Sequence, residues 1–206
     1  MIELLVATTN PGKLGEVQAF LRELPLRIIP LGSLADIPAV IEDGQTFEEN
    51  ALKKARTLAQ FSGLPTLADD SGLEVDALNG APGIYSSRYA GADGNDVHNN
   101  QKLLRELENI PENRRTARFV CALALCVPGT NGVSEWTARE SCEGSVGLDL
   151  RGSLGFGYDP LFFYPPFGKT FGEITREEKA TVSHRGKALQ KLAENLTSLL
   201  AMAAKP

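Results

Sequence analysis

Hydrophobic positions recur along the chain with two spacings, which predict alternating strands and helices. The apolar run at residues 2–7 predicts a buried first strand. Leucines and a valine three or four residues apart predict a helix over residues 13–24, and residues 27–31 predict a second strand. This strand–helix–strand order favours an α/β fold.

The same two spacings continue to the C-terminus. Residues 46–49 match a helix-capping box, and the helix that they open is expected to end at Gly63. The most apolar strand is predicted at residues 118–127, pairing with residues 135–143 as an antiparallel hairpin. Further strands are predicted at residues 66–68, 73–77 and 161–164, and further helices at residues 96–107 and 183–203. The apolar stripe of the last helix is predicted to comprise Leu189, Leu192, Leu196, Leu199 and Leu200. Since no repeat or linker interrupts the pattern, a single domain over residues 1–206 is expected.

Composition narrows the class of protein. The chain has 206 residues, 42% of them hydrophobic, which is enough for one domain, or one with two lobes, to bury a core. No apolar run reaches the roughly 18 residues of a membrane span, and the N-terminus lacks the pattern of a signal peptide, so no membrane partner is expected. Cys121, Cys126 and Cys142 are odd in number and lack a C-x-x-C spacing, which predicts buried thiols in a reducing cytoplasm.

The formal net charge of −5 disfavours a nonspecific nucleic-acid binder, because such proteins are usually basic. We therefore expect no nucleic-acid partner. A polyphosphate ligand would need positive charge that is concentrated locally.

Residues 8–13 form a predicted turn between a strand and a helix. Backbone N–H groups at a helix N-terminus suit a phosphate, and Lys13, which we expect to be exposed, adds a full charge. The segment is not a Walker A loop, which needs a glycine in place of Ala7 and a hydroxyl residue in place of Leu14. The alternative interpretation is an ordinary strand-to-helix turn.

Asp69-Asp70-Ser71-Gly72 directly follows a predicted strand. Two carboxylates at a strand end can hold a hard divalent cation, but adjacent strand residues point to opposite faces, so one carboxylate is expected to enter a given site. The alternative is a polar turn with a side-chain hydrogen bond to the backbone. Glu42 and residues 48–49 could supply further carboxylates.

Two segments nearer the C-terminus could recognise a nucleotide. His184 and Arg185, within residues 179–187, can together read carbonyl oxygens or phosphates. The glycines of residues 155–160 let the backbone approach a ligand closely, and an aromatic ring there can stack on a base. The alternatives are a solvated basic turn and a core aromatic in a tight turn. His98, on a predicted surface helix, is expected to be inert.

Taken together, these segments resemble the inosine triphosphate pyrophosphatase family, which includes the bacterial dITP/XTP pyrophosphatases. The resemblance covers nearly the whole chain. It rests, in order, on residues 7–13 (ATTNPGK), 46–51 (TFEENA), 54–56 (KAR), 68–73 (ADDSGL), 80–86 (GAPGIYS), 155–160 (GFGYDP) and 183–186 (SHRG). It implies a two-lobed α/β fold on a long mixed β-sheet with flanking helices, an active site in the cleft between the lobes, and a homodimer.

The resemblance also implies an activity. Non-canonical purine nucleoside triphosphates (dITP, ITP, XTP and dXTP) are expected to be hydrolysed to the monophosphate and pyrophosphate in the cytoplasm, with Mg²⁺ as cofactor. Asp70 is implied as general base and metal ligand, and Glu42 as the second metal carboxylate, with Asp69 as the alternative. The residues implied to bind substrate are Thr8, Thr9, Asn10, Pro11, Gly12, Lys13, Lys54, Ser71, Phe156, Gly157, Tyr158, Asp159, Lys179, His184 and Arg185. Thr9 replaces a glycine of the commoner family pattern S/T-G-N-x-G-K.

Three rival functions remain open. A phosphatase with an aspartyl nucleophile would use the pattern D-x-D-G-T, which residues 70–73 do not supply. A nucleotide sensor would bind its nucleotide without turnover. The presence of Asp70 beside a second carboxylate argues against this function. The related septum-site nucleotide pyrophosphatases prefer pyrimidine nucleotides, and His184-Arg185 disfavours that assignment.

Overall fold

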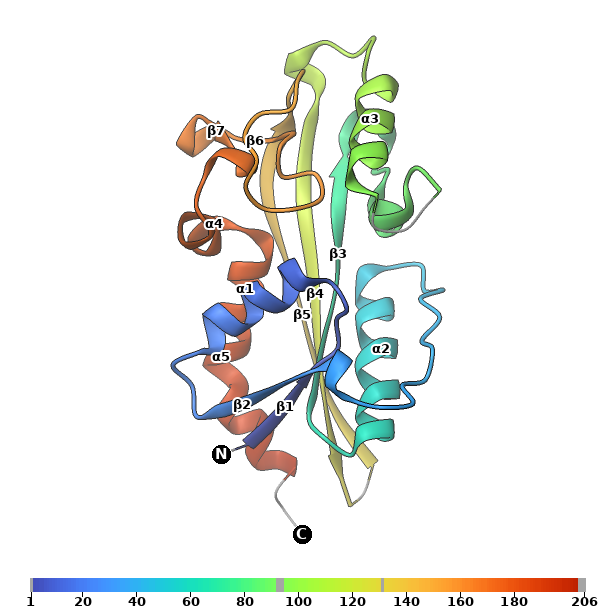
Figure 1. Cartoon of the computed structure of the whole chain (residues 1–206), viewed down its shortest axis with the longest axis vertical. Helices are drawn as coiled ribbons and strands as arrows, with labels where there is room; N and C mark the ends of the chain where they lie inside the picture. Colours follow the sequence, from blue (N-terminus) through green and yellow to red (C-terminus); the bar gives the residue numbers. More distant parts are fainter. Residues whose placement is uncertain (1, 92–94, 131, 204–206) are drawn as a thin grey trace. The chain divides into compact units, whose positions relative to one another are not determined.

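The computed structural model describes residues 2–91, 95–130 and 132–203 (Figure 1). The chain begins with the predicted strand–helix–strand unit: β1 (Ile2–Val6), α1 (Pro11–Leu21) and β2 (Leu26–Pro30). β2 pairs with β1 in parallel, with Leu4 opposite Ile28. Parallel neighbours need a crossover connection, which α1 provides.

The remaining elements follow the predicted order, with additions. The longer helices and the strands are α2 (Phe47–Ser62), β3 (Thr66–Val75), α3 (Asp96–Glu106), β4 (Thr116–Gly129), β5 (Gly132–Val146), β6 (Phe162–Tyr164), β7 (Lys169–Thr170), α4 (Arg176–Val182) and α5 (His184–Ala203). Short 3-10 helices lie at η1 (Leu31–Ser33), η2 (Asp76–Leu78), η3 (Gly83–Arg88), η4 (Glu112–Arg114), η5 (Pro165–Phe167) and η6 (Phe171–Glu173).

Within the described residues, seven strands form one sheet in the order β2-β1-β3-β4-β5-β6-β7. β1 pairs in parallel with β2 and β3, whereas β6 pairs antiparallel with β5 and β7. β4 ends at Gly129 and its neighbour β5 begins at Gly132, a connection so short that the two must run antiparallel. The predicted mixed α/β fold is therefore confirmed.

α2 begins and ends where its sequence predicts. The Thr46 hydroxyl accepts a hydrogen bond of 3.1 Å from the Glu49 N–H, and Gly63 ends the helix with a left-handed φ of 69°. The carboxylate of Glu49 accepts from the N–H of Gln45 at 2.7 Å, one residue before the position that a capping box would use.

β3 differs from its prediction. It is one continuous strand of ten residues that passes through Asp69 to Gly72, so the interpretation of these residues as a polar turn is wrong. A Cβ at Gly72 would lie 2.3 Å from the Oγ of Ser86, so the strand needs glycine there for η3 to approach. The helix α4 was not predicted; Thr175 and Glu178 form a reciprocal capping box at its start.

The chain divides into two compact units. The first unit comprises the described residues up to 70, between 121 and 140, and from 186 onward; the second comprises those between 71 and 120 and between 141 and 185. β3, β4 and β5 contribute residues to both.

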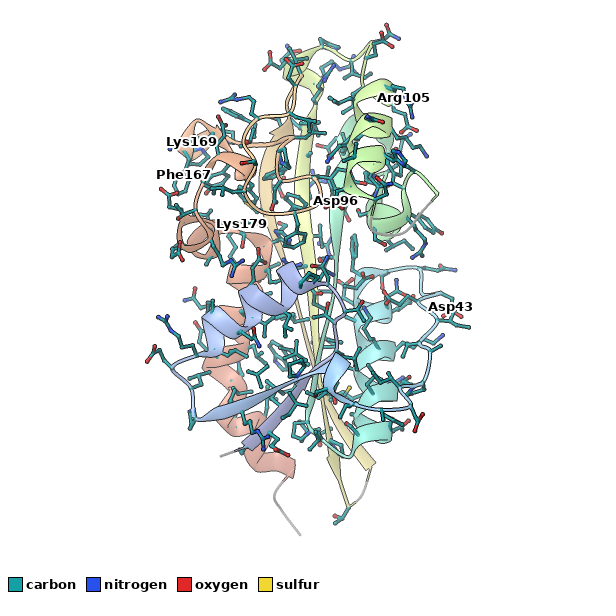
Figure 2. The ribbon with its side chains drawn as sticks, in the orientation of Figure 1. Asp43, Asp96, Arg105, Phe167, Lys169 and Lys179 are labelled. Carbon is teal, nitrogen blue, oxygen red and sulfur yellow. The ribbon has the colours of Figure 1, made fainter. Side chains whose placement is uncertain are left out.

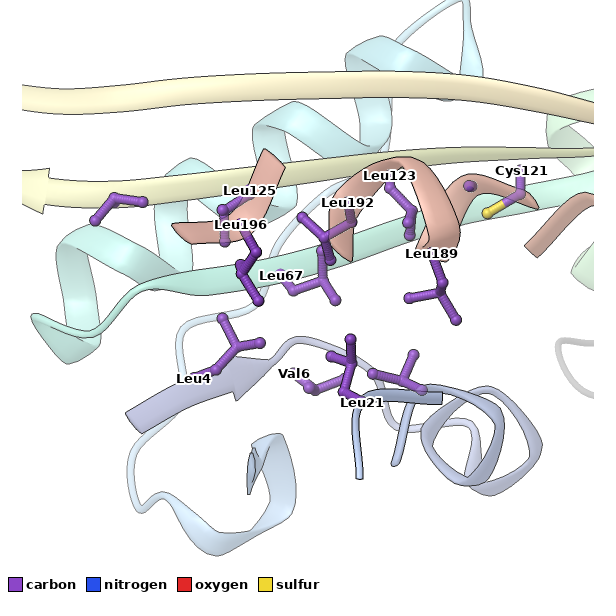
Figure 3. Packing of buried hydrophobic residues seen from close by; sticks show 13 residues of the cluster. Leu4, Val6, Leu21, Leu67, Cys121, Leu123, Leu125, Leu189, Leu192 and Leu196 are labelled. Atoms are coloured by element: carbon purple, nitrogen blue, oxygen red, sulfur yellow. The ribbon is translucent and has the colours of Figure 1, made fainter. Parts of the chain in front are cut away.

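The first unit has a core between its strands and two helices, α1 and α5 (Figure 3). α2 lies on the other side of these strands (Figure 1). The residues of the core that Figure 3 labels are Leu4, Val6, Leu21, Leu67, Cys121, Leu123, Leu125, Leu189, Leu192 and Leu196. The predicted apolar stripes of α1 and α5 are thus confirmed where their side chains are described; Leu200, predicted on the stripe of α5, lies outside the described side chains.

The second unit has a separate, aromatic core. The rings of Phe119, Phe162 and Phe171 contact one another at centroid distances of 4.6 to 5.9 Å. Leu103 and Leu107, from α3 and its C-terminal cap, are fully buried in the same cluster. All three cysteines of the chain are buried and stand outside any disulfide, as predicted. Over the part of the chain that is described, no helix is long and apolar enough to cross a membrane.

Candidate active site

The residues with predicted chemistry divide between the two units. The first unit holds residues 8–13, Glu42, Lys54 and Asp70. The second unit holds the remaining site residues, namely Ser71, Phe156, Gly157, Tyr158, Asp159, Lys179, His184 and Arg185. The boundary falls within β3, between Asp70 and Ser71.

The start of α1 caps itself. The Oδ1 of Asn10 accepts hydrogen bonds from the N–H groups of Gly12 at 2.8 Å and Lys13 at 3.1 Å. The N–H of Asn10 donates in turn to the Thr8 hydroxyl at 3.1 Å. A phosphate would have to displace the Asn10 side chain to reach those first helical N–H groups. Phosphate binding by this segment, including the exposed Thr9 and Pro11, therefore stays a prediction.

Lys13 is less exposed than expected. Its side chain is 17% exposed, and its Nζ lies 2.7 Å from the Oδ1 of Asp69, whose side chain is 6% exposed. The thiol of Cys121 lies 3.7 Å from the other oxygen of Asp69. Asp69 is two residues from Leu67 on β3, so it shares the face of the strand that packs toward α1. Lys13 consequently has a structural partner of its own, which its sequence position did not reveal.

Lys54 projects from α2 and joins two other parts of the unit. Its Nζ lies 2.8 Å from the Oε1 of Glu42 and donates a hydrogen bond of 3.1 Å to the backbone carbonyl of Asp69. The segment that carries Glu42 is tied to α2 nearby, because the N–H of Gly44 donates to the Oδ1 of Asn50 at 2.8 Å. Glu42 and Lys54, far apart in sequence, are thereby held together.

Asp70 faces the opposite side of β3 from Asp69, as the alternation of a strand predicts. Its Oδ2 accepts a hydrogen bond of 3.0 Å from the Nδ2 of Asn50 on α2. Asp70 is 8% exposed, and burial raises its pKa from the ordinary 3.8 to about 6. The charges of Lys13 and Lys54 and the Asn50 hydrogen bond oppose this rise, while the negative charge of Glu42 adds to it.

Asn50 received no role from sequence reasoning, although the sequence carries a signal for it. It is 1% exposed and lies on the inner face of α2 with Phe47 and Ala51, positions that are otherwise apolar. A polar residue within an apolar helical stripe must find a buried partner, which here is Asp70.

Asp70 and Glu42 offer the carboxylate oxygens that Mg²⁺ prefers. The negative charge of Glu42 helps to raise the pKa of Asp70, and a cation near both carboxylates would offset that repulsion. Among the described residues no group of three or more His, Cys, Asp or Glu side chains is arranged to hold a metal ion. An ion bound here would complete its shell with water and phosphate oxygens, which is typical of Mg²⁺. Binding of Mg²⁺ by Asp70 and Glu42 stays a prediction.

In the second unit, a half-buried phenylalanine lies beside two cations. The Nζ of Lys179 and the guanidinium of Arg185 lie 4.8 Å and 5.7 Å from the centroid of the Phe156 ring. Lys179, labelled on α4 in Figure 2, also forms a buried ion pair of 2.6 Å with Asp159. Arg185 is 1% exposed and donates a hydrogen bond of 2.7 Å to the Ser71 hydroxyl. The charge of Lys179 is therefore balanced within its own unit.

The turn at residues 156–159 is organised by Asp159. Its Oδ2, which pairs with Lys179, also accepts a hydrogen bond of 2.9 Å from the N–H of Phe156. A Cβ at Gly155 would lie 2.0 Å from that oxygen, so glycine is needed there. Tyr158 is 4% exposed in the core and donates to the carbonyl of Ser86 at 2.8 Å, so Phe156 is the ring of this turn with an open surface.

His184 and Arg185 are both buried, which excludes the interpretation of their segment as a solvated basic turn. His184 begins α5, and its ring stacks on Phe119 with a centroid distance of 4.7 Å and an interplanar angle of 14°. His98, by contrast, is exposed on α3, as predicted.

Comparison with known proteins gives likenesses that cover both units. The profile of the Ham1 family matches residues 4–195. A dITP/XTP pyrophosphatase of Geobacter sulfurreducens is 52% identical over 196 residues, which are 95% of this chain and 97% of that protein. A dITP/XTP pyrophosphatase of Clostridium perfringens is 45% identical, over 97% of this chain and 100% of that protein. The structure of a HAM1 protein from Coxiella burnetii has a TM-score of 0.86 at 43% identity, over 96% of this chain and 100% of that chain.

Proposed function

The chain belongs to the Ham1 family, and we propose that it hydrolyses non-canonical purine nucleoside triphosphates, such as dITP, ITP and XTP, to the monophosphate and pyrophosphate. Relatives that are named dITP/XTP pyrophosphatases and match nearly the full chain support this reaction. The observation that carries the proposal is the buried carboxyl of Asp70 beside Glu42, Lys13 and Lys54.

The cluster of Asp70, Glu42, Lys13 and Lys54 in the first unit suits binding of the triphosphate and its hydrolysis. Lys13 and Lys54 supply positive charge toward a polyanion, and in a partly buried site that charge is weakly screened. Asp70 takes a proton from the water that attacks the α-phosphorus. A bond forms between the water oxygen and the α-phosphorus, the bond to the bridging oxygen breaks, and pyrophosphate leaves. Burial raises the pKa of Asp70 to about 6, which is still below neutral pH. Most of the carboxyl is therefore ionised at pH 7, as a base must be.

The cofactor in this proposal is Mg²⁺, held by Asp70 and Glu42. When bound, it supplies charge stabilisation on the transferring phosphoryl group and the leaving oxygen. Asn50 keeps Asp70 oriented through its hydrogen bond, and Lys54 does the same for Glu42 through their ion pair.

The cluster of Phe156, Lys179 and Arg185 in the second unit suits binding of a purine base. The half-buried ring of Phe156, flanked by the cations of Lys179 and Arg185, offers a surface for stacking. Hypoxanthine and xanthine carry a 6-carbonyl, which can accept a hydrogen bond from Arg185 or His184. Adenine carries an amino donor at that position and would leave such donors unpaired, a mismatch that can lower the rate by a factor of about 10⁴.

A substrate panel tests the proposal. ITP, dITP, XTP, ATP, CTP and UTP are incubated with the protein, with Mg²⁺ or with EDTA, and monophosphate, pyrophosphate and orthophosphate are quantified separately. We expect equal amounts of monophosphate and pyrophosphate from the first three nucleotides, much slower turnover of the others, and no turnover with EDTA. Orthophosphate as the primary product, or ATP cleaved as fast as ITP, would contradict the proposal.

Two further expectations follow from the family resemblance alone, a homodimer and a cytoplasmic location. Light scattering on the purified full chain gives the mass of the particle in solution. A mass corresponding to one chain at working concentration would rule out the homodimer.

A further inference from the structure

Two residues of α3 hold the peptide groups of Gly157 on both sides. The N–H of Gly157 donates a hydrogen bond of 2.6 Å to the Oδ2 of Asp96, and the Nδ2 of Asn100 donates one of 2.9 Å to the carbonyl of Gly157. Asp96 and Asn100 are four residues apart and therefore lie on the same face of the helix. Figure 2 labels Asp96 at the start of α3, on the side of the loop that precedes β6.

Gly157 belongs to the same turn as the Phe156 ring. It has a left-handed φ of 63° and directly follows Phe156 in the turn that Asp159 organises from within. The contacts with α3 hold the same turn from outside. A change in the position of Gly157 would therefore move the ring of Phe156 relative to Lys179 and Arg185, the two cations beside it.

α3 is firmly anchored in its own unit. Leu103 is fully buried in the aromatic core. The side chain of Asn99 accepts a hydrogen bond of 2.7 Å from the N–H of Ala90 and donates one of 2.9 Å to the carbonyl of Ser87. A helix held in this way can fix the position of a loop that it contacts.

We propose that Asp96 and Asn100 are positioning residues for recognition of the purine base, acting through Gly157 on the stacking surface of Phe156. The inference rests on the proposed function. Neither residue supplies a group to the chemistry, because the proposed general base is Asp70 and its partner is Asn50. Losing either contact with Gly157 should weaken nucleotide binding and leave the chemical step nearly unchanged.

The two contacts have opposite polarity, which gives a crossed test. Asp96→Asn keeps an oxygen that can accept from the Gly157 N–H, whereas Asp96→Ala removes it. Asn100→Asp exchanges the donor for an acceptor that faces the Gly157 carbonyl, so it should behave like Asn100→Ala or worse. A simple effect of net charge would not give this pattern. His98→Ala, exposed on the same helix, is the matched control.

For each variant, kcat and KM for ITP hydrolysis, binding of IMP by calorimetry and the melting temperature without ligand are measured. We expect Asp96→Ala, Asn100→Ala and Asn100→Asp to raise KM and the Kd for IMP about tenfold, the order of effect of one lost hydrogen bond. Their kcat should stay within about threefold of wild type. Asp96→Asn and His98→Ala should resemble wild type in KM, in kcat and in the Kd for IMP.

Three outcomes overturn the inference. The first is unchanged KM in all variants, and the second is failure of Asp96→Asn to preserve KM. The third is a lowered melting temperature with reduced kcat at unchanged KM, which is the result of a purely structural role. If wild type neither cleaves ITP nor binds IMP, the proposed function fails instead, so the two failures are distinguishable.

Discussion

Asp69 and Asp70 are neighbours in β3, and residues on different helices hold their carboxylates. Lys13 of α1 pairs with Asp69 at 2.7 Å, while Asn50 of α2 donates to Asp70 at 3.0 Å. Alternation along the strand sends the two side chains to opposite faces. Substitutions at the two positions should therefore have different consequences.

Replacing each acid by its amide separates the two roles. Asp70→Asn keeps the shape and an acceptor for Asn50 but removes the charge and the proton acceptor. It should lower kcat about 100-fold or more, the effect expected from loss of a general base. Asp69→Asn should lower activity less, through the position of Lys13. Both variants are assayed with ITP across a Mg²⁺ titration; nearly full activity of Asp70→Asn at saturating Mg²⁺ would remove Asp70 from its role.

The stability of the metal-free protein should depend on pH through Asp70. Because burial raises its pKa from 3.8 to about 6, the unfolded chain releases this proton at lower pH than the folded chain. Ionisation of Asp70 therefore lowers the free energy of unfolding as pH rises from about 4 to about 6, by up to about 3 kcal/mol. Asp70→Asn should be as stable as wild type near pH 4 and more stable than wild type at pH 7.

Denaturant unfolding in EDTA measures this difference at each pH. Asp149→Asn, which replaces an exposed carboxylate, is the control. If the difference in free energy of unfolding between Asp70→Asn and wild type is the same from pH 4 to pH 7, the Asp70 carboxyl titrates alike in the folded and unfolded states, which would contradict the prediction.

Lys13 should contribute to stability as well as to substrate binding. Lys13→Met removes the cation paired with the buried Asp69, and loss of one partner of a buried pair costs about 3 kcal/mol. The double variant Lys13→Met/Asp69→Asn should recover most of that loss, because the buried charge is gone. Both variants should show a smaller rise in melting temperature with ITP than wild type.

Scanning calorimetry with and without ITP checks the cycle. Arg27→Met is the control, because Arg27 pairs with Glu3 on the surface and its removal should change the melting temperature little. An unchanged melting temperature of Lys13→Met would mean that the ion pair with Asp69 does not stabilise the fold.

Local features of the fold were predictable from the sequence because short-range physics determines them. The apolar run of β1, the spacing of Val17 and Leu21 on α1, and the Thr46 cap of α2 each depend on residues a few positions apart. The residue types of the site segments were visible as well, since carboxylates, lysines and the glycine-flanked aromatics of residues 155–160 are identifiable without coordinates.

The tertiary structure decided which of these residues meet. Three sets of contacts join residues of separate elements that are between 20 and 61 positions apart in the chain. They are the Asp69–Lys13 ion pair, the Asn50–Asp70 hydrogen bond and the contacts of α3 with Gly157. Such contacts depend on strand register and helix packing, which no local pattern encodes. Register also made Asp69 and Asp70 interior residues of β3 rather than a turn, and burial against α2 is what raises the pKa of Asp70.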